Sequence, residues 1–217
     1  MSTLPGRTIV KVCGLTRRED AAHALACGAD WLGFIVLGES VRSIPAEAAG
    51  AIVESLDAAV AVAVMVAPTP EAALAIASRM GASRIQLHQV DPIQWPSDFP
   101  LPCAFALGVD PTGSMLGMAP PLPHLVLLDT AHERLAGGTG RTFPWHAAVA
   151  LAATREVMLA GGLGADNVAA AIQAVRPFGV DASSRLESGP GVKDAELVRR
   201  YVAAVRECDE RRDAATR

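Results

Sequence analysis

Residues 8–36 read TIVKVCGLTRREDAAHALACGADWLGFIV, and this stretch holds one complete unit of the pattern that decides the fold. An apolar run at 8–13 is followed by a helix-like segment at 17–27, which ends at Gly28, and then by a second apolar run at 31–36. A glycine just past the last helical position is typical of a helix end. Near-continuous apolar runs are typical of parallel strands that are buried on both faces. The stretch therefore predicts a strand, a helix and a second strand parallel to the first.

The same alternation continues along the chain. We expect eight strands, at 8–13, 31–36, 60–66, 84–88, 103–109, 124–129, 156–160 and 179–183. Helices fit between most of them: Thr69 is the expected N-cap of a helix that closes at Gly81, and the last helix is expected to begin near Asp194. The connections 91–100 and 110–123 are rich in Pro and Gly and leave room only for short helices.

Alternating strands and helices predict the α/β class with a parallel sheet. Eight such units in 217 residues favour a single (β/α)8 TIM barrel with eight parallel strands, and we expect one domain over residues 1–217. The alternative is an open doubly wound sheet, which should carry a Gly-x-Gly-x-x-Gly turn after its first strand. That turn here reads Cys13-Gly14-Leu15-Thr16. A weak internal repeat, in which 28–32 resembles 81–85, also supports repeated units.

Composition excludes several classes of function. The net charge of −4 offers no basic surface for nucleic acid, and no apolar run reaches the ~18 residues of a membrane span. The four cysteines form no Cys-x-x-Cys pair, so we expect no metal site. The start of the sequence shows no signal-peptide pattern, and we expect a cytoplasmic protein with reduced thiols.

Polar residues gather where the predicted strands end, and in a barrel of this kind the carboxyl ends of the strands carry the active site. Taken singly, each has a plainer interpretation: Cys13 as a small core residue, Asp129 as a turn cap, His88 as a hydrogen-bonded structural residue. Core packing would not place so many at one end of otherwise apolar strands. The candidate site residues are Cys13, Arg42, Gln86, His88, Asp129, Gly161, Gly162, Asp181, Ser183 and Ser184.

Two adjacent loops point to a phosphate. Residues 160–164 read Ala-Gly-Gly-Leu-Gly after the seventh strand and open a helix, and 181–184 read Asp-Ala-Ser-Ser after the eighth. Glycine lets backbone N–H groups approach an anion, and a helix N-terminus attracts negative charge. The alternative is two helix caps. Because the loops after strands seven and eight often bind phosphate in this fold, we predict phosphate binding by Gly161, Gly162, Ser183 and Ser184.

Lys11 stands inside an apolar strand. It lies two residues before Cys13, so both side chains should face the same side of the sheet. If that side is the barrel interior, the ammonium must be paired, and we expect a barrel carboxylate as its partner. A nearby cation lowers a thiol pKa, so we predict that Lys11 helps to keep Cys13 partly ionised near neutral pH. The alternative is a purely structural ion pair.

With these residues in place, the sequence resembles the phosphoribosylanthranilate isomerase family of tryptophan biosynthesis over nearly its full length. The stretches that carry the resemblance are 11–16, 28–30 with Gly33 and Phe34, Arg42 with Pro45, 86–88, 128–129, the Gly-Gly-Thr-Gly of 137–140 with Phe143 and Trp145, 160–163 with Asn167 and Val168, and 180–184 with Glu187, Gly191, Lys193 and Asp194. Each motif alone is weak, whereas Cys-Gly-Leu-Thr, Gly-Gly-Thr-Gly and Val-Asp-Ala-Ser-Ser in this order are specific together.

The resemblance implies an isomerase that performs an Amadori rearrangement without metal or organic cofactor. It implies that Asp129 is the general acid, which protonates the ring oxygen and opens the furanose to a Schiff base. Cys13 would be the general base, which removes the C2′ proton. Arg42 would steer or bind the anthranilate carboxylate, and Asp181 would help to hold the sugar. Gln86 and His88 are the further candidates for substrate binding.

The sequence departs from the family pattern at a few positions. Gln89 replaces a usual Gly, Arg185-Leu186 replaces a usual Gly-Val, and Val41 and Ser43 flank Arg42 in place of the usual Pro and aromatic residues. Two alternatives therefore stay open: a paralogue that acts on another aminoribose phosphate, and a non-catalytic phosphosugar-binding barrel. The presence of both proton-transfer residues disfavours the second. The expected partner is a small phosphosugar, and a homodimer is retained as an option.

Overall fold

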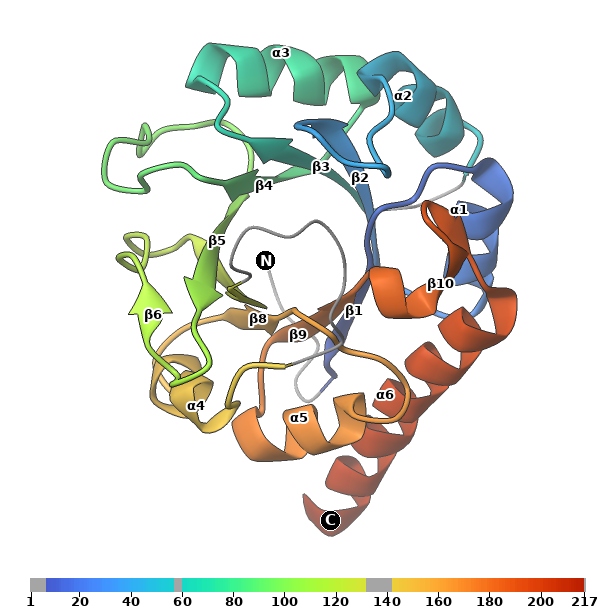
Figure 1. The fold of residues 1–217 in the computed structure, drawn as a ribbon, viewed down its shortest axis with the longest axis vertical. Helices are drawn as coiled ribbons and strands as arrows, with labels where there is room; N and C mark the ends of the chain where they lie inside the picture. The colour runs from blue at the N-terminus through green and yellow to red at the C-terminus, as the bar shows by residue number, and fades with distance from the viewer. Residues whose placement is uncertain (1–6, 57–59, 132–141, 217) are drawn as a thin grey trace.

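The computed structural model describes residues 7–56, 60–131 and 142–216, and its central feature is a closed sheet. Eight parallel strands lie in the order β1-β2-β3-β4-β5-β7-β8-β9, and pairing of β4 with β5 and of β1 with β9 closes the ring (Figure 1). The predicted (β/α)8 barrel is confirmed. Its strands are β1 (Ile9–Val12), β2 (Trp31–Leu37), β3 (Val60–Val66), β4 (Arg84–His88), β5 (Cys103–Val109), β7 (Leu125–Thr130), β8 (Val157–Leu159) and β9 (Gly179–Ala182).

Helices surround this ring on its outside (Figure 1). They are α1 (Arg18–Ala26), α2 (Ala46–Glu54), α3 (Pro70–Met80), α4 (His146–Ala152), α5 (Val168–Val175) and α6 (Ala195–Thr216). The predicted signals of α3 are confirmed, since Thr69 accepts a hydrogen bond from the N–H of Ala72 and Gly81 ends the helix with a φ of 67°. Asp194 caps α6 by accepting from the N–H groups of its first turn.

The short helices that the sequence allows in 91–100 and 110–123 do not form. The first connection consists of turns, and the second contains only a two-residue strand, β6 (Met115–Leu116), which pairs antiparallel with β5. Asp110 supplies the physical reason in the second case. Its Oδ1 accepts from the N–H groups of Thr112 and Ser114 and so closes a tight turn in place of a helix.

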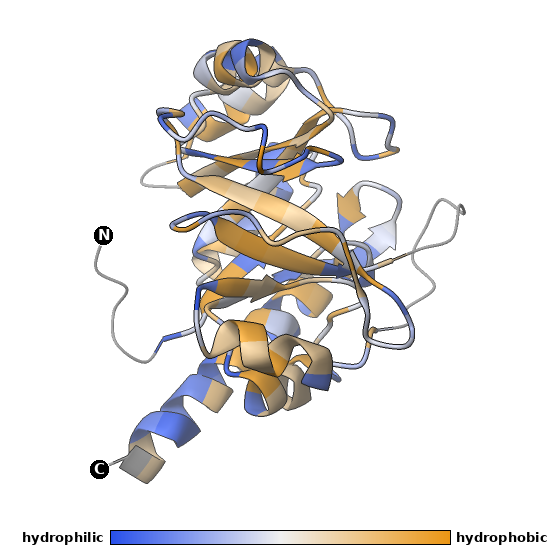
Figure 2. Ribbon diagram, turned by 90° about the vertical axis from the view of Figure 1, so that its left-hand side faces the viewer, coloured by the Kyte–Doolittle hydropathy of each residue, from blue (hydrophilic) through white to orange (hydrophobic). Residues whose placement is uncertain are grey.

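The apolar side chains form two layers. Alternate strand residues such as Ala61, Ala63 and Met65 pack toward the helices, whereas Val62 and Val64 belong to a smaller cluster with Cys13. In Figure 2 the strands are coloured mainly as hydrophobic, while the end of α6 that projects from the barrel carries many hydrophilic residues. The barrel interior is therefore a packed core, and Cys13 sits at its edge.

A small hairpin follows the last barrel strand. After β9 the chain makes one 3-10 turn, η1 (Ser184–Leu186), and then the antiparallel pair β10 (Glu187–Gly189) and β11 (Val192–Lys193). This hairpin brings Glu187 and Lys193 to the rim of the barrel, beside the loop that follows β2.

Candidate active site

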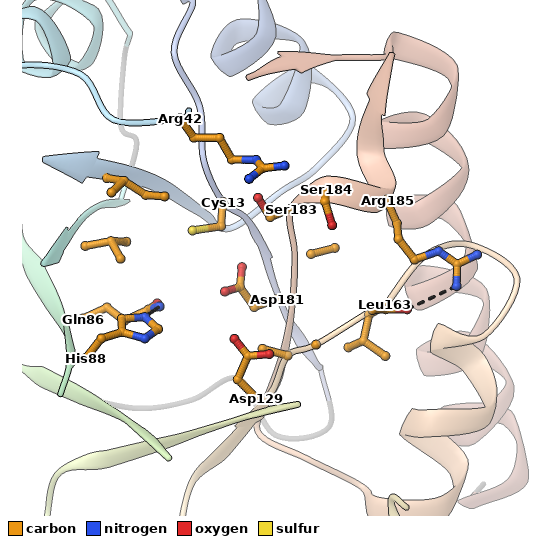
Figure 3. A pocket seen from close by; sticks show the side chains of 16 residues that line it. Cys13, Arg42, Gln86, His88, Asp129, Leu163, Asp181, Ser183, Ser184 and Arg185 are labelled. Atoms are coloured by element: carbon orange, nitrogen blue, oxygen red, sulfur yellow. Dashed lines mark hydrogen bonds between the residues drawn. The ribbon is translucent and has the colours of Figure 1, made fainter. Parts of the chain in front are cut away.

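A cavity of about 200 Å³ opens at the carboxyl ends of the barrel strands. All ten candidate residues line it, together with Arg185 and five apolar residues (Figure 3). The structure therefore brings together all ten candidate residues, from six different barrel strands and the loops that follow them. Those ten are Cys13, Arg42, Gln86, His88, Asp129, Gly161, Gly162, Asp181, Ser183 and Ser184.

Lys11 lies inside the barrel and is fully buried. Its Nζ donates to Oδ2 of Asp181 at 2.8 Å, so the predicted pairing with a barrel carboxylate is confirmed. Gly33 makes room for this group: a Cβ at that position would lie 2.8 Å from Sγ of Cys13 and 3.0 Å from Nζ of Lys11. The thiol and the ammonium thus flank the same glycine.

The ionisation of Cys13 differs from the prediction. Burial raises the pKa of the Cys13 thiol above its ordinary value, and the neighbouring charge of Lys11 lowers it by less. This direction opposes the predicted partial ionisation of Cys13 near neutral pH. The influence of Lys11 has the predicted sign, but the desolvation of the buried thiol outweighs it.

The two carboxylate oxygens of Asp181 differ in their hydrogen bonding. Oδ2 accepts from Lys11, whereas Oδ1 is buried and has no hydrogen-bond partner among the described residues. Burial also raises the pKa of Asp181, although Lys11 opposes this effect. A buried acceptor without a hydrogen-bond partner is energetically costly. Because Asp181 lines the cavity, its Oδ1 is suited to accept a hydrogen bond from a ligand.

Asp129 stands near the end of β7 and depends on Gly161 for its space. Gly161 has a φ of 80°, and a Cβ there would lie 2.7 Å from Oδ1 of Asp129 and closer still to Thr130. Only glycine fits this position. In the view of Figure 3, Cys13 and Asp129 lie on opposite sides of Asp181, and all three line the same cavity.

Arg42 is held by a carboxylate that the sequence left without a role. Its Nε and Nη2 donate to the two oxygens of Glu187 at 2.7 and 2.8 Å, which is the two-pronged geometry of a strong pair. Lys193 donates to the same Glu187 at 2.8 Å. Burial opposes ionisation of Glu187, but these bonds outweigh it and lower its pKa. Nη1 of Arg42 has no partner among the described residues.

Gln86 and His88 form a neutral pair. The side-chain amide of Gln86 donates to Nε2 of His88 at 2.9 Å, so the ring proton of His88 resides on Nδ1. Burial lowers the pKa of His88 to about 4, with a smaller contribution from Lys11. His88 is therefore neutral near pH 7 and can contribute a hydrogen bond to a ligand, but no positive charge.

The two glycine and serine loops lie side by side at the cavity. Gly161 and Gly162 both have positive φ, at 80° and 67°. Asn167 fixes this loop: its side chain accepts from the N–H of Gly164 and donates to the carbonyl of Gly162, both at 2.9 Å. Ser183 and Ser184 face the same cavity from the loop after β9. The arrangement is a glycine-rich turn that leads into helix α5, as anion sites often are.

The structure also bears on the expectations about metal sites, membrane spans and the motif at 137–140. Among the described residues, no cluster of three or more His, Cys, Asp or Glu side chains is arranged to hold a metal ion. Within that same part of the chain, no helix is both long and apolar enough to cross a membrane. The Gly-Gly-Thr-Gly motif at 137–140 lies outside the described residues.

Comparison with known proteins gives one consistent family. The family described as N-(5′-phosphoribosyl)anthranilate (PRA) isomerase matches residues 10–204. The isomerase of Rubrobacter xylanophilus is 41% identical, over 91% of this chain and 98% of its own length. That of Pelobacter propionicus is 38% identical, over 91% and 95%.

Solved structures agree with the sequence relatives. Phosphoribosyl anthranilate isomerase from Thermus thermophilus superposes with a TM-score of 0.79 at 34% identity, over 92% of this chain and 99% of that one. The Thermotoga maritima isomerase gives 0.78 at 30% identity over the same shares. A further isomerase structure holds reduced 1-(o-carboxyphenylamino)-1-deoxyribulose 5-phosphate and superposes with a TM-score of 0.75 at 29% identity, over 92% of this chain and 99% of that one.

Proposed function

The chain belongs to the N-(5′-phosphoribosyl)anthranilate isomerase family, and we propose that it works as this isomerase with Cys13 as general base and Asp129 as general acid. The reaction converts N-(5-phosphoribosyl)anthranilate to 1-(2-carboxyphenylamino)-1-deoxyribulose 5-phosphate. The observation that carries the assignment is one cavity lined by a thiol, a carboxylic acid and two phosphate-type loops.

The conversion of the substrate to the enolamine has two steps, and each step contains one proton transfer. Asp129 gives a proton to the ring oxygen, the C1′–O bond breaks, and the nitrogen lone pair forms a Schiff base. Cys13 then takes the C2′ proton, and the electrons of the C–H bond form the enolamine double bond while the nitrogen becomes neutral. The enolamine becomes the ketone product when C1′ gains a proton and the C2′ hydroxyl loses one. Two groups on different sides of the reacting atoms are what this sequence requires. Their placement on separate strands of one barrel supports these roles.

The remaining residues would hold the substrate. The phosphate would bind the loops of Gly161, Gly162, Ser183 and Ser184, where backbone N–H groups and the start of α5 favour an anion. Nη1 of Arg42 would receive the anthranilate carboxylate. The unused Oδ1 of Asp181 would accept a hydrogen bond from a sugar hydroxyl, and Gln86 with neutral His88 would complete the lining.

A direct assay tests the proposal. Substrate generated in place is fluorescent, and an isomerase should remove this fluorescence at a rate proportional to the concentration of protein. A non-catalytic phosphosugar-binding barrel would bind the reduced product analogue without turnover. Binding of that analogue together with no conversion of substrate would overturn the assignment as an enzyme.

The same proposal extends to the state of the protein in the cell. We propose one folding unit over 1–217, because β1 pairs with β9 and so joins the two ends of the barrel. A single cooperative unfolding transition is the expected result.

All four cysteines are free thiols, which supports a cytoplasmic location. A homodimer is proposed because the Thermotoga maritima isomerase is described as dimeric, and light scattering at several concentrations would test it.

A further inference from the structure

Arg185 is a charged residue at the phosphate loops to which neither the family pattern nor the mechanism assigns a role. It follows Ser184 directly, in η1. Nη1 donates to the carbonyl of Gly162 at 3.2 Å, and Nη2 donates to Asp166 at 2.8 Å. Its side chain is about one third exposed and lines the cavity (Figure 3). The guanidinium thus bridges the two loops that would hold a phosphate.

The bond to Gly162 affects the peptide that joins it to Leu163. In a trans peptide the C=O and the N–H point in opposite directions. Asn167 and Arg185 both donate to the carbonyl of Gly162, so they draw this oxygen toward themselves. The N–H of Leu163 is then turned away from Arg185, and Leu163 itself lines the cavity. Arg185 and Asn167 therefore hold the peptide between Gly162 and Leu163 in one orientation.

The partner of Arg185 in the unliganded protein is easily displaced. Asp166 is mostly exposed, with 60% of its side chain accessible, and exposed ion pairs are weak. A phosphate dianion carries more charge and three acceptor oxygens, and arginine matches its geometry with parallel N–H groups. A phosphate in the cavity would therefore compete with Asp166 for the same guanidinium.

We infer that Arg185 is an additional phosphate-binding residue of this chain, which supplies a side-chain cation to a site otherwise built from backbone N–H groups and serines. The inference rests on the proposed phosphate site. It also assigns a role to Asp166, as the carboxylate that holds Arg185 in place until a phosphate binds.

Competition by inorganic phosphate tests this directly. The inhibition constant of phosphate against substrate should rise about tenfold in Arg185→Met, with KM raised similarly and kcat nearly unchanged. Arg185→Lys should recover part of the loss, because it restores the charge without the fork. Arg199→Met, which removes an exposed arginine of α6 paired with Glu196, is the matched control and should leave phosphate binding unchanged.

The variant Asp166→Asn distinguishes phosphate binding by Arg185 from a role of Arg185 in anchoring the loop through Asp166. If Arg185 binds phosphate, this variant should bind phosphate more tightly, and most of the gain should vanish in the Arg185→Met background. If Arg185 only anchors the loop through Asp166, both single variants should weaken phosphate binding, and that result would overturn the inference. Failure of wild type to bind phosphate competitively would instead refute the proposed phosphate site.

Discussion

Lys11 and Asp181 are register partners on the paired strands β1 and β9, and their side chains form an ion pair at 2.8 Å inside the barrel. Both groups are nearly inaccessible, at 1% and 7% of the side chain. The pair spans the seam that closes the ring, and it lies beside Cys13 on the same face of β1. It therefore links the closure of the fold to the electrostatics of the proposed base.

Removal of one member of this ion pair should affect both the stability of the barrel and the electrostatics of Cys13. Lys11→Met should lower the free energy of unfolding by ~3–5 kcal/mol, because it leaves a buried carboxylate without its partner. The double variant Lys11→Met with Asp181→Asn should recover part of this stability. Chemical denaturation of the wild type and the two variants would measure it, and an equal or larger loss in the double variant would contradict the prediction.

The same variants test the electrostatic role of Lys11. Because Lys11 lowers the pKa of Cys13 against the effect of burial, its removal should raise the thiol pKa further. The pH dependence of alkylation of Cys13 should shift to higher pH in Lys11→Met. Cys27 is the most exposed of the other cysteines and must be replaced in all samples. Identical profiles in folded proteins would leave Lys11 with a structural role alone.

The raised pKa of Cys13 predicts the pH profile of the enzyme. A general base acts in its deprotonated form, and a thiol whose pKa is raised above its ordinary value is mostly protonated at pH 7. Because the first step also needs Asp129 in its protonated form, the titration of the base is best followed in Asp129→Asn, where the acid no longer titrates. The residual kcat/KM of this variant should increase as the pH rises from neutral into the alkaline range, and a flat profile would argue against Cys13 as a base with a raised pKa.

Substitution of the proposed base should remove turnover while the fold persists. In Cys13→Ser a hydroxyl replaces the thiol, and because it is a far weaker acid it supplies almost no base. We expect a loss of at least ~10²-fold in kcat. Cys103→Ser is a suitable control, since that thiol is also buried but lies at the start of β5, away from the cavity. Near-normal turnover by Cys13→Ser would rule out the proposed role.

Asp129→Asn should abolish most activity but preserve binding. The amide has nearly the same shape, but it cannot give a proton to the ring oxygen. The reduced product analogue should therefore bind within a few-fold of its wild-type affinity, as measured by calorimetry. If binding is lost as well, Asp129 serves the structure and not the chemistry.

Glu187 should act through Arg42. Glu187→Gln replaces a two-pronged ionic contact with a neutral one, so Arg42 should lose its fixed orientation. We expect KM to rise about tenfold with a smaller change in kcat. A product analogue that lacks the anthranilate carboxylate should bind the wild type and the variant equally. If Glu187→Gln weakens the binding of this analogue as much as it raises KM, Glu187 only stabilises the hairpin.

The sequence by itself determined where the barrel strands lie and which of their ends carry polar groups. The strands predicted at 60–66, 84–88 and 103–109 have those same bounds in the structure. The first and the third are near-continuous apolar runs, which can be recognised because burial on both faces of a parallel strand selects apolar residues consecutively. Residues that break these runs at their carboxyl ends, such as Asp129, stand out for the same reason.

Only the tertiary structure decided which groups meet and how they ionise. Lys11 and Asp181 are 170 positions apart, and Arg42 and Glu187 are 145 apart, so neither pairing leaves a local pattern in the sequence. Ring closure brings the first pair together, and the hairpin after β9 brings the second. The protonation of Cys13 likewise depends on how completely the closed barrel excludes water, which opposes the thiolate more strongly than one neighbouring ammonium supports it.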